Sequence, residues 1–274
     1  MNYLLEEIIR IALMEDLGHG DITSVLTVPE DHASRANIIA KEQFLLAGMP
    51  FVREIFKTVD DGIILDALVQ EGNNVGKGDV IAEVSGKTRS LLAGERIALN
   101  ILQRISGIAT ITKSYADKVK GLPVIIVDTR KTVPGMRYME KYGVRMGGGR
   151  NHRFGLYDGI LIKDNHIKIA GGVAKAVEAA RMRHHLLKIE VEVKDFKELN
   201  DALDSGADII MLDNMSVKDM AEAVRLVKGR ALLEASGNVN LHNVREIAET
   251  GVDIISIGAL THSAKAVDIS MKII

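Results

Sequence analysis

The sequence contains no cysteine among its 274 residues, and this absence excludes several kinds of chemistry. Without cysteine there is no disulfide framework, no thiolate metal site and no cysteine nucleophile. No apolar run reaches the length that crosses a bilayer. The net charge is only −2 and there is no long basic tail, which gives little support to nucleic-acid binding. We therefore expect a cytoplasmic protein that binds neither nucleic acid nor membrane.

The residues that are present indicate a folded chain of one large or two modest domains. Hydrophobic residues make up 47% of the sequence, enough for a substantial core. The N-terminal segment, MNYLLEEIIRIALMED, has the pattern of an acidic amphipathic helix rather than of a secretory signal. We expect this helix over about Leu4–Leu17, and Gly18 is the kind of residue that ends a helix.

The rest of the N-terminal third mixes strands and helices. The segment ASRANIIAKE alternates apolar and polar residues and predicts a half-buried strand. A helix is predicted around Pro50–Val59, and residues 62–92 favour short strands separated by Gly/Asn turns. A long helical region follows over Leu91–Val119, with a break predicted near Gly107.

From Val124 onward the pattern changes to short β-branched runs, several of them separated by helices. The runs are VIIVDTRK, GILIKDNH, KIEVEV, DIIMLDN, ALLEASGN and DIISIGAL. Continuous apolar strands that alternate with helices predict a parallel sheet covered by helices. Two segments, SGADIIMLDN and TGVDIISIGA, are near-repeats with an aspartate at the strand entry. This repetition favours a (β/α) barrel built from similar units.

In such barrels the chemistry takes place at the carboxyl ends of the strands. The polar residues at these ends differ along the chain. They are Asp128, Arg130 and Lys131, then Lys163, Asp164 and Asn165, then Glu190 and Glu192, then Asp213 and Asn214, then Glu234, Ser236 and Gly237, and finally Ser256 and Gly258. The predicted barrel mouth therefore collects cations from its early strands, carboxylates from the middle strands and Gly/Ser turns from the last two.

A strongly basic segment indicates an anion site. Residues 128–168 hold nine Lys/Arg against four Asp/Glu, a local charge of +5 in a chain of net charge −2. Arg130 and Lys131 could be ordinary rim charges, the Gly147–Gly149 turn could be a flexible loop, and His152 could be structural. Their occurrence in one segment together with Arg153 favours carboxylate or phosphate binding, because Arg and Lys are the side chains that bind these anions.

The acids and turns of the later strands allow two interpretations each. Glu192 and Asp213 either neutralise the basic cluster or hold sugar hydroxyls or a hydrated Mg²⁺. The turns Ser236–Asn238 and Gly258–Ala259 stand where barrels often bind phosphate on backbone N–H groups, although Gly turns after strands are common. Arg96 lies on a helix beside Glu95 and could form an internal salt bridge there.

Several long motifs resemble the quinolinate phosphoribosyltransferase family, also called carboxylating nicotinate-nucleotide pyrophosphorylase. The resemblance runs nearly end to end. It is carried by EDLGHGDITS (Glu15–Ser24), GERIALNILQRISGIAT (Gly94–Thr110), DTRKTVPGMR (Asp128–Arg137), EKYGVRMGGGRNHRFGLYDGILIKDNH (Glu140–His166), IEVEV, LDN, EASGN and IGALTHS. The resemblance implies an α/β protein: an N-terminal α/β sandwich over residues 1–110 and an incomplete (β/α) barrel with parallel strands over 111–262. It also implies that the tail, 263–274, returns to the sandwich.

The resemblance further implies a homodimer, or an assembly of dimers, with active sites shared between subunits. Quinolinate would be held by Arg130, His152, Arg153 and Lys163. Catalysis would involve Lys131, Lys163, Glu192 and Asp213, with Mg²⁺ near Glu192 and Asp213, directly or through water. The 5-phosphate of phosphoribosyl pyrophosphate would rest on Ser236, Gly237, Asn238, Gly258, Ala259 and His262, and Arg96 would come from the partner subunit. The turn SGNVN has Asn238 where many relatives have a second glycine.

The implied reaction is transfer of phosphoribosyl from phosphoribosyl pyrophosphate to quinolinate with decarboxylation, which gives nicotinate mononucleotide, pyrophosphate and CO₂. Three alternatives remain open at this point. A molybdenum-transport-associated homologue shares the fold and acts on or binds a different anion. A non-catalytic member would bind an anionic ligand only. A barrel aldolase would use Lys163 as a Schiff base.

Overall fold

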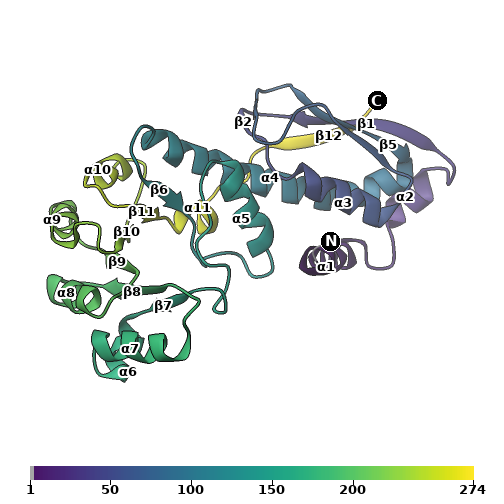
Figure 1. The fold of residues 1–274 in the computed structure, drawn as a ribbon. Helices are drawn as coiled ribbons and strands as arrows, with labels where there is room; N and C mark the ends of the chain where they lie inside the picture. The colour runs from purple at the N-terminus through teal and green to yellow at the C-terminus, as the bar shows by residue number, and fades with distance from the viewer. Residues whose placement is uncertain (1–2) are drawn as a thin grey trace. The chain divides into compact units, whose positions relative to one another are not determined.

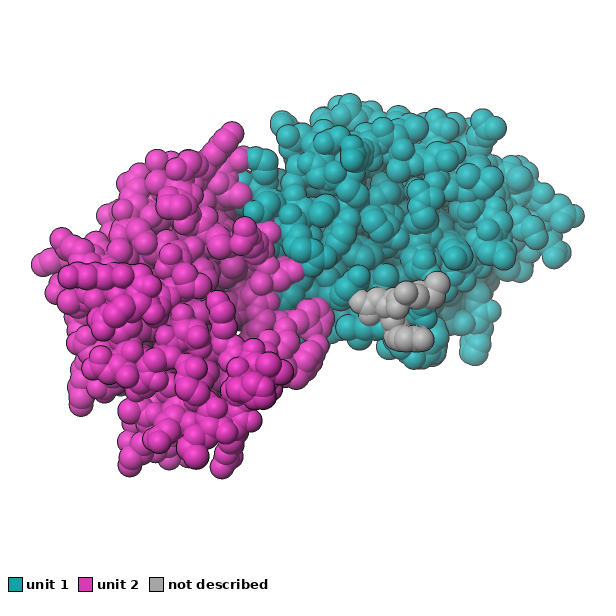
Figure 2. Space-filling view, in the orientation of Figure 1, with its two compact units in different colours: residues 1–113, 132–148, 263–274 teal, residues 114–131, 149–262 magenta. Residues whose placement is uncertain are grey.

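The computed structural model describes residues 3–274 (Figure 1). Its internal contacts divide the chain into two compact units, coloured separately in Figure 2. Unit 1 comprises residues up to 113 together with 132–148 and 263–274, and unit 2 comprises 114–131 and 149–262. Residues 132–148, which the sequence analysis assigned to the barrel, thus pack with unit 1. Within residues 3–274, no helix combines the length and apolar character needed to span a bilayer.

Unit 1 contains a four-stranded antiparallel sheet in the order β12-β1-β5-β3. The C-terminal strand pairs with β1, with Ile38 opposite Met271, so the C-terminal segment joins the sheet of the N-terminal third of the chain. The strands are β1 (Ala33–Ala40), β3 (Ile64–Ala67), β5 (Val80–Lys87) and β12 (Ile269–Ile273), beside a small pair of β2 (Phe44–Leu45) and β4 (Asn74–Val75). The helices are α1 (Tyr3–Leu17), α2 (Ile22–Thr27), α3 (Met49–Val59) and α5 (Arg137–Met146).

The long helix α4 (Thr88–Lys118) runs without interruption, so the predicted break near Gly107 is wrong. A Cβ at Gly107 would collide with the carbonyl oxygen of Lys265. The glycine therefore serves the close approach of the C-terminal segment and does not end the helix. A similar close approach occurs at Gly147, which directly follows α5. A Cβ there would collide with the backbone of Ala109 on α4, so the end of α5 packs directly against α4.

Unit 2 contains a six-stranded parallel sheet in the order β6-β11-β10-β9-β8-β7. The first strand of the sheet in the sequence lies beside the last, and the sheet is open between β6 and β7. This is the incomplete (β/α) barrel expected from the sequence, and each of the six predicted strands is present. They are β6 (Ile125–Val127), β7 (Ile160–Ile162), β8 (Ile189–Val193), β9 (Ile209–Asp213), β10 (Leu232–Ser236) and β11 (Ile254–Ser256). The covering helices are α6 (Asp164–Ala170), α7 (Val173–Arg183), α8 (Phe196–Asp204), α9 (Val217–Val227), α10 (Val244–Glu249) and α11 (Ala259–His262).

Strand alternation decides which side chains enter the barrel. On β8 the apolar residues Ile189, Val191 and Val193 are fully buried on the side of α7 and α8. Glu190 and Glu192 alternate with them and therefore point to the interior. The two acids lie at different depths, because Glu192 is two residues nearer to the carboxyl end of the strand. The barrel thus carries polar side chains both at its mouth and one step below it.

Candidate active site

A cavity of about 270 Å³ opens at the carboxyl ends of the unit 2 strands. It brings together eight of the residues predicted for the site. They are Arg130, Lys131, His152, Arg153, Lys163, Glu192, Asp213 and Ser236, and Thr129, Leu161, Met211, Glu234 and Ser256 complete the lining. Because these side chains come from all six strands or the segments that follow them, the barrel geometry rather than local sequence makes the cluster.

The other predicted residues lie outside this lining. Gly258 is directly adjacent to it, because a Cβ there would stand 3.0 Å from Cδ of Lys131 and 3.1 Å from Cδ2 of His262. Ala259 begins the short helix α11. Arg96 belongs to unit 1, where its side chain is 58% exposed and its Nη2 lies 4.0 Å from Oε1 of Glu95.

The turn after β10 is fixed by an asparagine pair. Gly237 and Asn238 both have positive φ, at 94° and 52°. Nδ2 of Asn238 donates to Oδ1 of Asn214 at 3.0 Å, and Nδ2 of Asn214 donates to Oδ2 of Asp213 at 3.0 Å. A Cβ at Gly237 would collide with the Asn214 side chain, so glycine is required for this contact. The pair joins the phosphate turn predicted from the sequence to the Asp213 carboxylate.

An ion pair spans the mouth between β7 and β8. Nζ of Lys163 lies 2.6 Å from Oε2 of Glu192. Lys163 directly precedes α6, and its backbone N–H donates to Nδ1 of His166 at 2.9 Å. The lysine side chain is 43% exposed, so it is accessible to a ligand as well as to the carboxylate.

The buried carboxylate of Asp128 holds the segment that carries the next cations. Oδ1 accepts from the backbone N–H of His152 at 2.9 Å, and Oδ2 accepts from Nδ2 of Asn151 at 2.6 Å. The backbone of Arg150 also pairs with Ile126 of β6, at 2.9 Å. The segment therefore runs beside β6, on the open side of the sheet, and delivers His152 and Arg153 to the mouth. Sequence analysis had placed Asp128 only at a strand end.

Arg153 is a cation held in a partly desolvated position. Its Nη1 donates to the carbonyl oxygen of Gly159 at 3.0 Å. Burial, and next the nearby Arg130, lower the pKa of Arg153 below its usual value, whereas Glu190 and Asp158 oppose this shift. Two guanidinium groups that destabilise each other in a shared cavity favour the entry of an anion.

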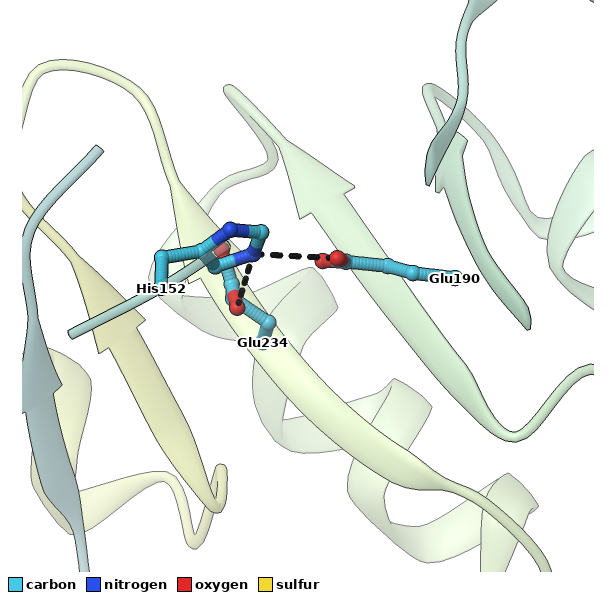
Figure 3. Close-up of side chains that lie close together, drawn as sticks. All are labelled: His152, Glu190 and Glu234. Carbon is cyan, nitrogen blue, oxygen red and sulfur yellow. Dashed lines mark hydrogen bonds and ion pairs between the residues drawn. The ribbon is translucent and has the colours of Figure 1, made fainter. Parts of the chain in front are cut away.

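Beneath the mouth, His152 lies against two buried acids (Figure 3). Its Nε2 is 3.0 Å from Oε2 of Glu190 and 3.6 Å from Oε2 of Glu234. The two glutamates are 4% and 1% exposed, and Oε1 of each has no hydrogen-bond partner. Burial, and next Glu190, raise the pKa of Glu234 to about 7, while His152 opposes this shift.

The sequence analysis placed Glu190 and Glu234 among the polar residues at the strand ends but gave them no role in the site, although the sequence held a signal for one. Each stands two residues before a predicted site residue, Glu192 or Ser236, and so shares its face of the strand. With His152 they form a group whose three ligand atoms lie within 4.8 Å of one another. The predicted metal pair, Glu192 and Asp213, is separate from this group.

Comparison with known proteins identifies the family. The family model for the quinolinate phosphoribosyl transferase N-terminal domain matches residues 21–106, and that for the C-terminal domain matches 108–272. This chain belongs to the quinolinate phosphoribosyltransferase family. A tobacco quinolinate phosphoribosyltransferase [decarboxylating], 2b, is 44% identical, covering 99% of this chain and 82% of the relative. A probable nicotinate-nucleotide pyrophosphorylase [carboxylating] of Bacillus subtilis is 42% identical, covering 100% and 95%.

Solved structures support the same assignment. The nicotinate-nucleotide pyrophosphorylase of Francisella tularensis superposes with a TM-score of 0.94 at 42% identity, covering 99% of this chain and 96% of that one. The protein of the same name from Ehrlichia chaffeensis gives 0.95 at 38% identity, covering 100% and 99%. The family and the fold class predicted from the sequence are therefore confirmed. The molybdenum-associated alternative is not favoured, because these relatives are named as phosphoribosyltransferases or pyrophosphorylases.

Proposed function

We propose that the protein transfers phosphoribosyl from phosphoribosyl pyrophosphate to quinolinate with loss of CO₂, a step of de novo NAD biosynthesis. The observation that carries this proposal is the mouth of unit 2, where one cavity is lined by several cations and by the acid pair Glu192 and Asp213. Such a cavity suits a dicarboxylate and a polyanionic ribosyl donor side by side. The non-catalytic and aldolase alternatives leave part of this lining without a role.

The quinolinate side is formed by Arg130, His152, Arg153 and Lys163. Arg153 is desolvated and stands near Arg130, so an incoming carboxylate would relieve the repulsion between them. Lys163 is already paired with Glu192, and a ligand carboxylate can share or replace that partner. Nicotinate lacks one carboxylate and would leave a buried cation unpaired, which predicts strong discrimination against it.

The donor side is formed by the acid pair and the last two turns. Glu192 and Asp213 can hold ribose hydroxyls while their charge favours the oxocarbenium-like state of the sugar. Lys131, whose side chain lies against Gly258, is the cation that we assign to the pyrophosphate leaving group. The 5-phosphate is assigned to the turns and residues around them: Ser236, Gly237, Asn238, Gly258, Ala259 and His262.

Glu192 and Asp213 provide the hard oxygen donors that Mg²⁺ prefers, so their chemistry fits a hydrated ion held through one or two carboxylates. When bound, Mg²⁺ would neutralise charge on the pyrophosphate leaving group. Decarboxylation follows alkylation of the pyridine nitrogen. The electrons of the broken C–C bond remain on the ring carbon, which then takes up a proton. Lys131 or Lys163 can stabilise this carbanion.

We further propose that the protein acts as a cytoplasmic homodimer or an assembly of dimers. Both units expose large apolar side chains. They are Ile11, Met14, Ile22, Val25 and Leu26 in unit 1, and Leu156, Tyr157, Ile169, Met182 and Leu186 in unit 2. Exposed apolar groups of this size favour burial against a partner. Arg96, exposed on α4, is the residue that the partner subunit would contribute to each site.

The test of the reaction is turnover with purified protein. Quinolinate, phosphoribosyl pyrophosphate and Mg²⁺ should give nicotinate mononucleotide, pyrophosphate and CO₂, and removal of Mg²⁺ with EDTA should abolish the products. Nicotinate should be a poor substrate in the same assay. Equal turnover of nicotinate, or none of quinolinate, would refute the assignment. Borohydride trapping with a keto substrate should yield no adduct at Lys163.

The shared site is tested by mixing two inactive variants, Arg96→Ala and Lys163→Ala. In a mixed dimer one site carries both lesions, and the other combines an intact Arg96 with an intact Lys163. Random exchange at equal amounts makes roughly half of the dimers mixed, so about a quarter of wild-type activity should return. Native mass spectrometry confirms exchange. Mixed dimers without recovered activity would show that Arg96 serves its own subunit.

A further inference from the structure

The position of His152 between the mouth and two buried acids is not explained by quinolinate binding alone. The ring lines the mouth cavity and also a second cavity of about 350 Å³ below it. Figure 3 shows Nε2 directed toward both carboxylates. Glu190 and Glu234 stand two residues below Glu192 and Ser236 on their strands, a depth of about 6–7 Å. The acids therefore contact the histidine from beneath the site.

This cluster of two buried carboxylates and one imidazole is expected to hold one additional proton, either on the ring or on Glu234, whose pKa burial raises to about 7. Two carboxylates, each with an oxygen within 4.8 Å of the other's, share one imidazole nitrogen, and both are almost fully buried. With the additional proton on Glu234, the ring is neutral and its Nε2–H can donate to Glu190 alone. With an imidazolium, Nε2–H donates to Glu190 at 3.0 Å and the positive charge attracts Glu234 at 3.6 Å.

Among the other charged groups, Arg153 also interacts electrostatically with Glu190. Asp128 is bound to Asn151 and to the His152 backbone, and Lys163 is paired with Glu192. The remaining charged groups that line the two cavities come from every surrounding segment. They are Arg130 and Lys131 after β6, Asp158 before β7, Lys188 before β8, and Asp213 on β9.

We propose that Glu190 and Glu234 are positioning residues that hold His152 as an imidazolium, and so make it a permanent cation of the quinolinate cluster. This inference rests on the proposed function for its ligand, but not for the protonation of His152. A neutral histidine would contribute only a hydrogen bond to the substrate. A fixed imidazolium adds a full charge toward a dianion, and it keeps that charge above the pH at which an ordinary histidine loses its proton.

A metal ion in the cluster is the competing explanation. Ligands at about 2.0–2.1 Å from a tetrahedral Zn²⁺ stand about 3.3 Å or more apart. Nε2 and Oε2 of Glu190 are closer, at 3.0 Å, which is the distance of an N–H···O hydrogen bond. The geometry therefore favours a proton, and elemental analysis of the purified protein separates the two explanations.

The protonation of His152 is measured without any substrate. In ¹⁵N-histidine-labelled protein at pH 8, the His152 signal, assigned with His152→Asn, should be that of an imidazolium. In the isosteric double variant Glu190→Gln/Glu234→Gln it should be that of a neutral ring. A neutral His152 in the wild type, or a stoichiometric metal that shifts the signal when EDTA removes it, would overturn the proposal.

The consequence for the substrate is measured by the KM for quinolinate at two pH values. In the double variant the KM at pH 8 should rise by about tenfold or more, which is the effect of removing one charge-assisted interaction. At pH 6, where an unsupported histidine regains its proton, it should return to within about threefold of wild type. The KM for phosphoribosyl pyrophosphate should hardly change. Glu249→Gln, which removes an exposed carboxylate of unit 2, is the matched control.

Each outcome separates the two proposals. If the wild type does not convert quinolinate, the proposed function fails, whereas the ¹⁵N signal still decides the state of His152. If the double variant does not fold, Glu234→Gln alone should give a smaller increase in the same KM, with the same recovery at pH 6. A KM increase that is equal at both pH values would assign the acids a purely structural role and overturn the proposal.

Discussion

The two units bury glutamates in opposite ways. In unit 1, Glu140 is fully buried, with Arg104 donating through Nε at 2.8 Å and Nη2 at 2.6 Å, and the backbone of Val133 donating at 3.2 Å. In unit 2, Glu190 and Glu234 are almost equally buried, but each has an oxygen without a partner and each faces the other acid across His152. Burial alone therefore does not indicate what a carboxylate does.

The number of hydrogen-bond donors around a buried carboxylate distinguishes a structural role from a functional one. A buried carboxylate with a full set of hydrogen bonds stabilises the folded structure around it. Its removal leaves the partner charge less well compensated in a low-dielectric interior. A buried acid with missing donors raises the free energy of the folded state and persists where the site uses its charge. Substitutions of the two kinds of glutamate should therefore change stability with opposite signs.

The largest expected effect is the loss of stability in Glu140→Ala. It removes the carboxylate oxygen Oε1 that accepts from both Nε and Nη2 of Arg104, whose side chain is 25% exposed. Breaking such a pair costs about 3–5 kcal/mol. Urea denaturation measures the change. The control Glu249→Ala removes an exposed i,i+4 pair with Arg245 and should cost less than about 1 kcal/mol. Equal losses of stability in the two variants would show that Glu140 stabilises unit 1 no more than an exposed glutamate does.

Glu234→Gln should instead stabilise the protein, and only at high pH. The pKa of Glu234 is raised from 4.5 to about 7, so its stabilising contribution is fully present below pH 4.5 and is lost as the pH rises through 7. Glutamine has no proton to lose. The variant should therefore match wild type near pH 4.5 and exceed it by up to about 3 kcal/mol above pH 8. Thermal unfolding at several pH values tests this; a difference that is constant with pH would contradict it.

The sequence predicted the strands of unit 2 because their signal is local. Six β-branched runs and the near-repeats around Asp208 and Asp253 are visible in the order of residues alone. The break near Gly107 was wrong because the reason for that glycine is a contact with Lys265, 158 positions away in the chain. The residues around a glycine in the sequence do not show whether it ends a helix or allows a distant backbone segment to approach the helix closely.

The mouth was predicted more completely than the layer beneath it. Residues such as Lys163 and Glu192 stand at strand ends, where barrel chemistry is expected. Glu190 and Glu234 lie inside strands, and their depth and mutual approach depend on the register of β8, β9 and β10. That register is set by packing across the whole sheet, so the contact of both acids with His152 became visible only in the structure.

A third prediction concerns a cation rather than an acid. Arg153→Ala should reduce kcat/KM for quinolinate by about 30- to 150-fold, the equivalent of about 2–3 kcal/mol for one charge-assisted interaction with the substrate. Stability should fall much less, because within the protein the substitution removes one hydrogen bond to the carbonyl of Gly159. Titration calorimetry should show phosphoribosyl pyrophosphate binding nearly unchanged. Asp213→Ala should weaken the donor instead, and the reversed pattern would reject this division of the mouth.

The smallest expected effect on stability is that of a substitution in unit 1, at Tyr142. Its hydroxyl donates to Oε2 of Glu71 at 2.7 Å, and the backbone N–H groups of Gly48 and Met49 donate to the same carboxylate at the start of α3. Tyr142→Phe removes one of several donors and should cost about 1–2 kcal/mol.

Burial, and next Glu71, raise the pKa of Tyr142 above its usual value, so the phenol keeps its proton through the range in which Glu234 titrates. The stability lost in Tyr142→Phe should therefore be the same at pH 6 and pH 9, unlike the gain in Glu234→Gln. Urea denaturation at both values compares them. A pH-dependent loss would mean that Glu71, like Glu234, changes its protonation within this range, and the contrast between the units would then fail.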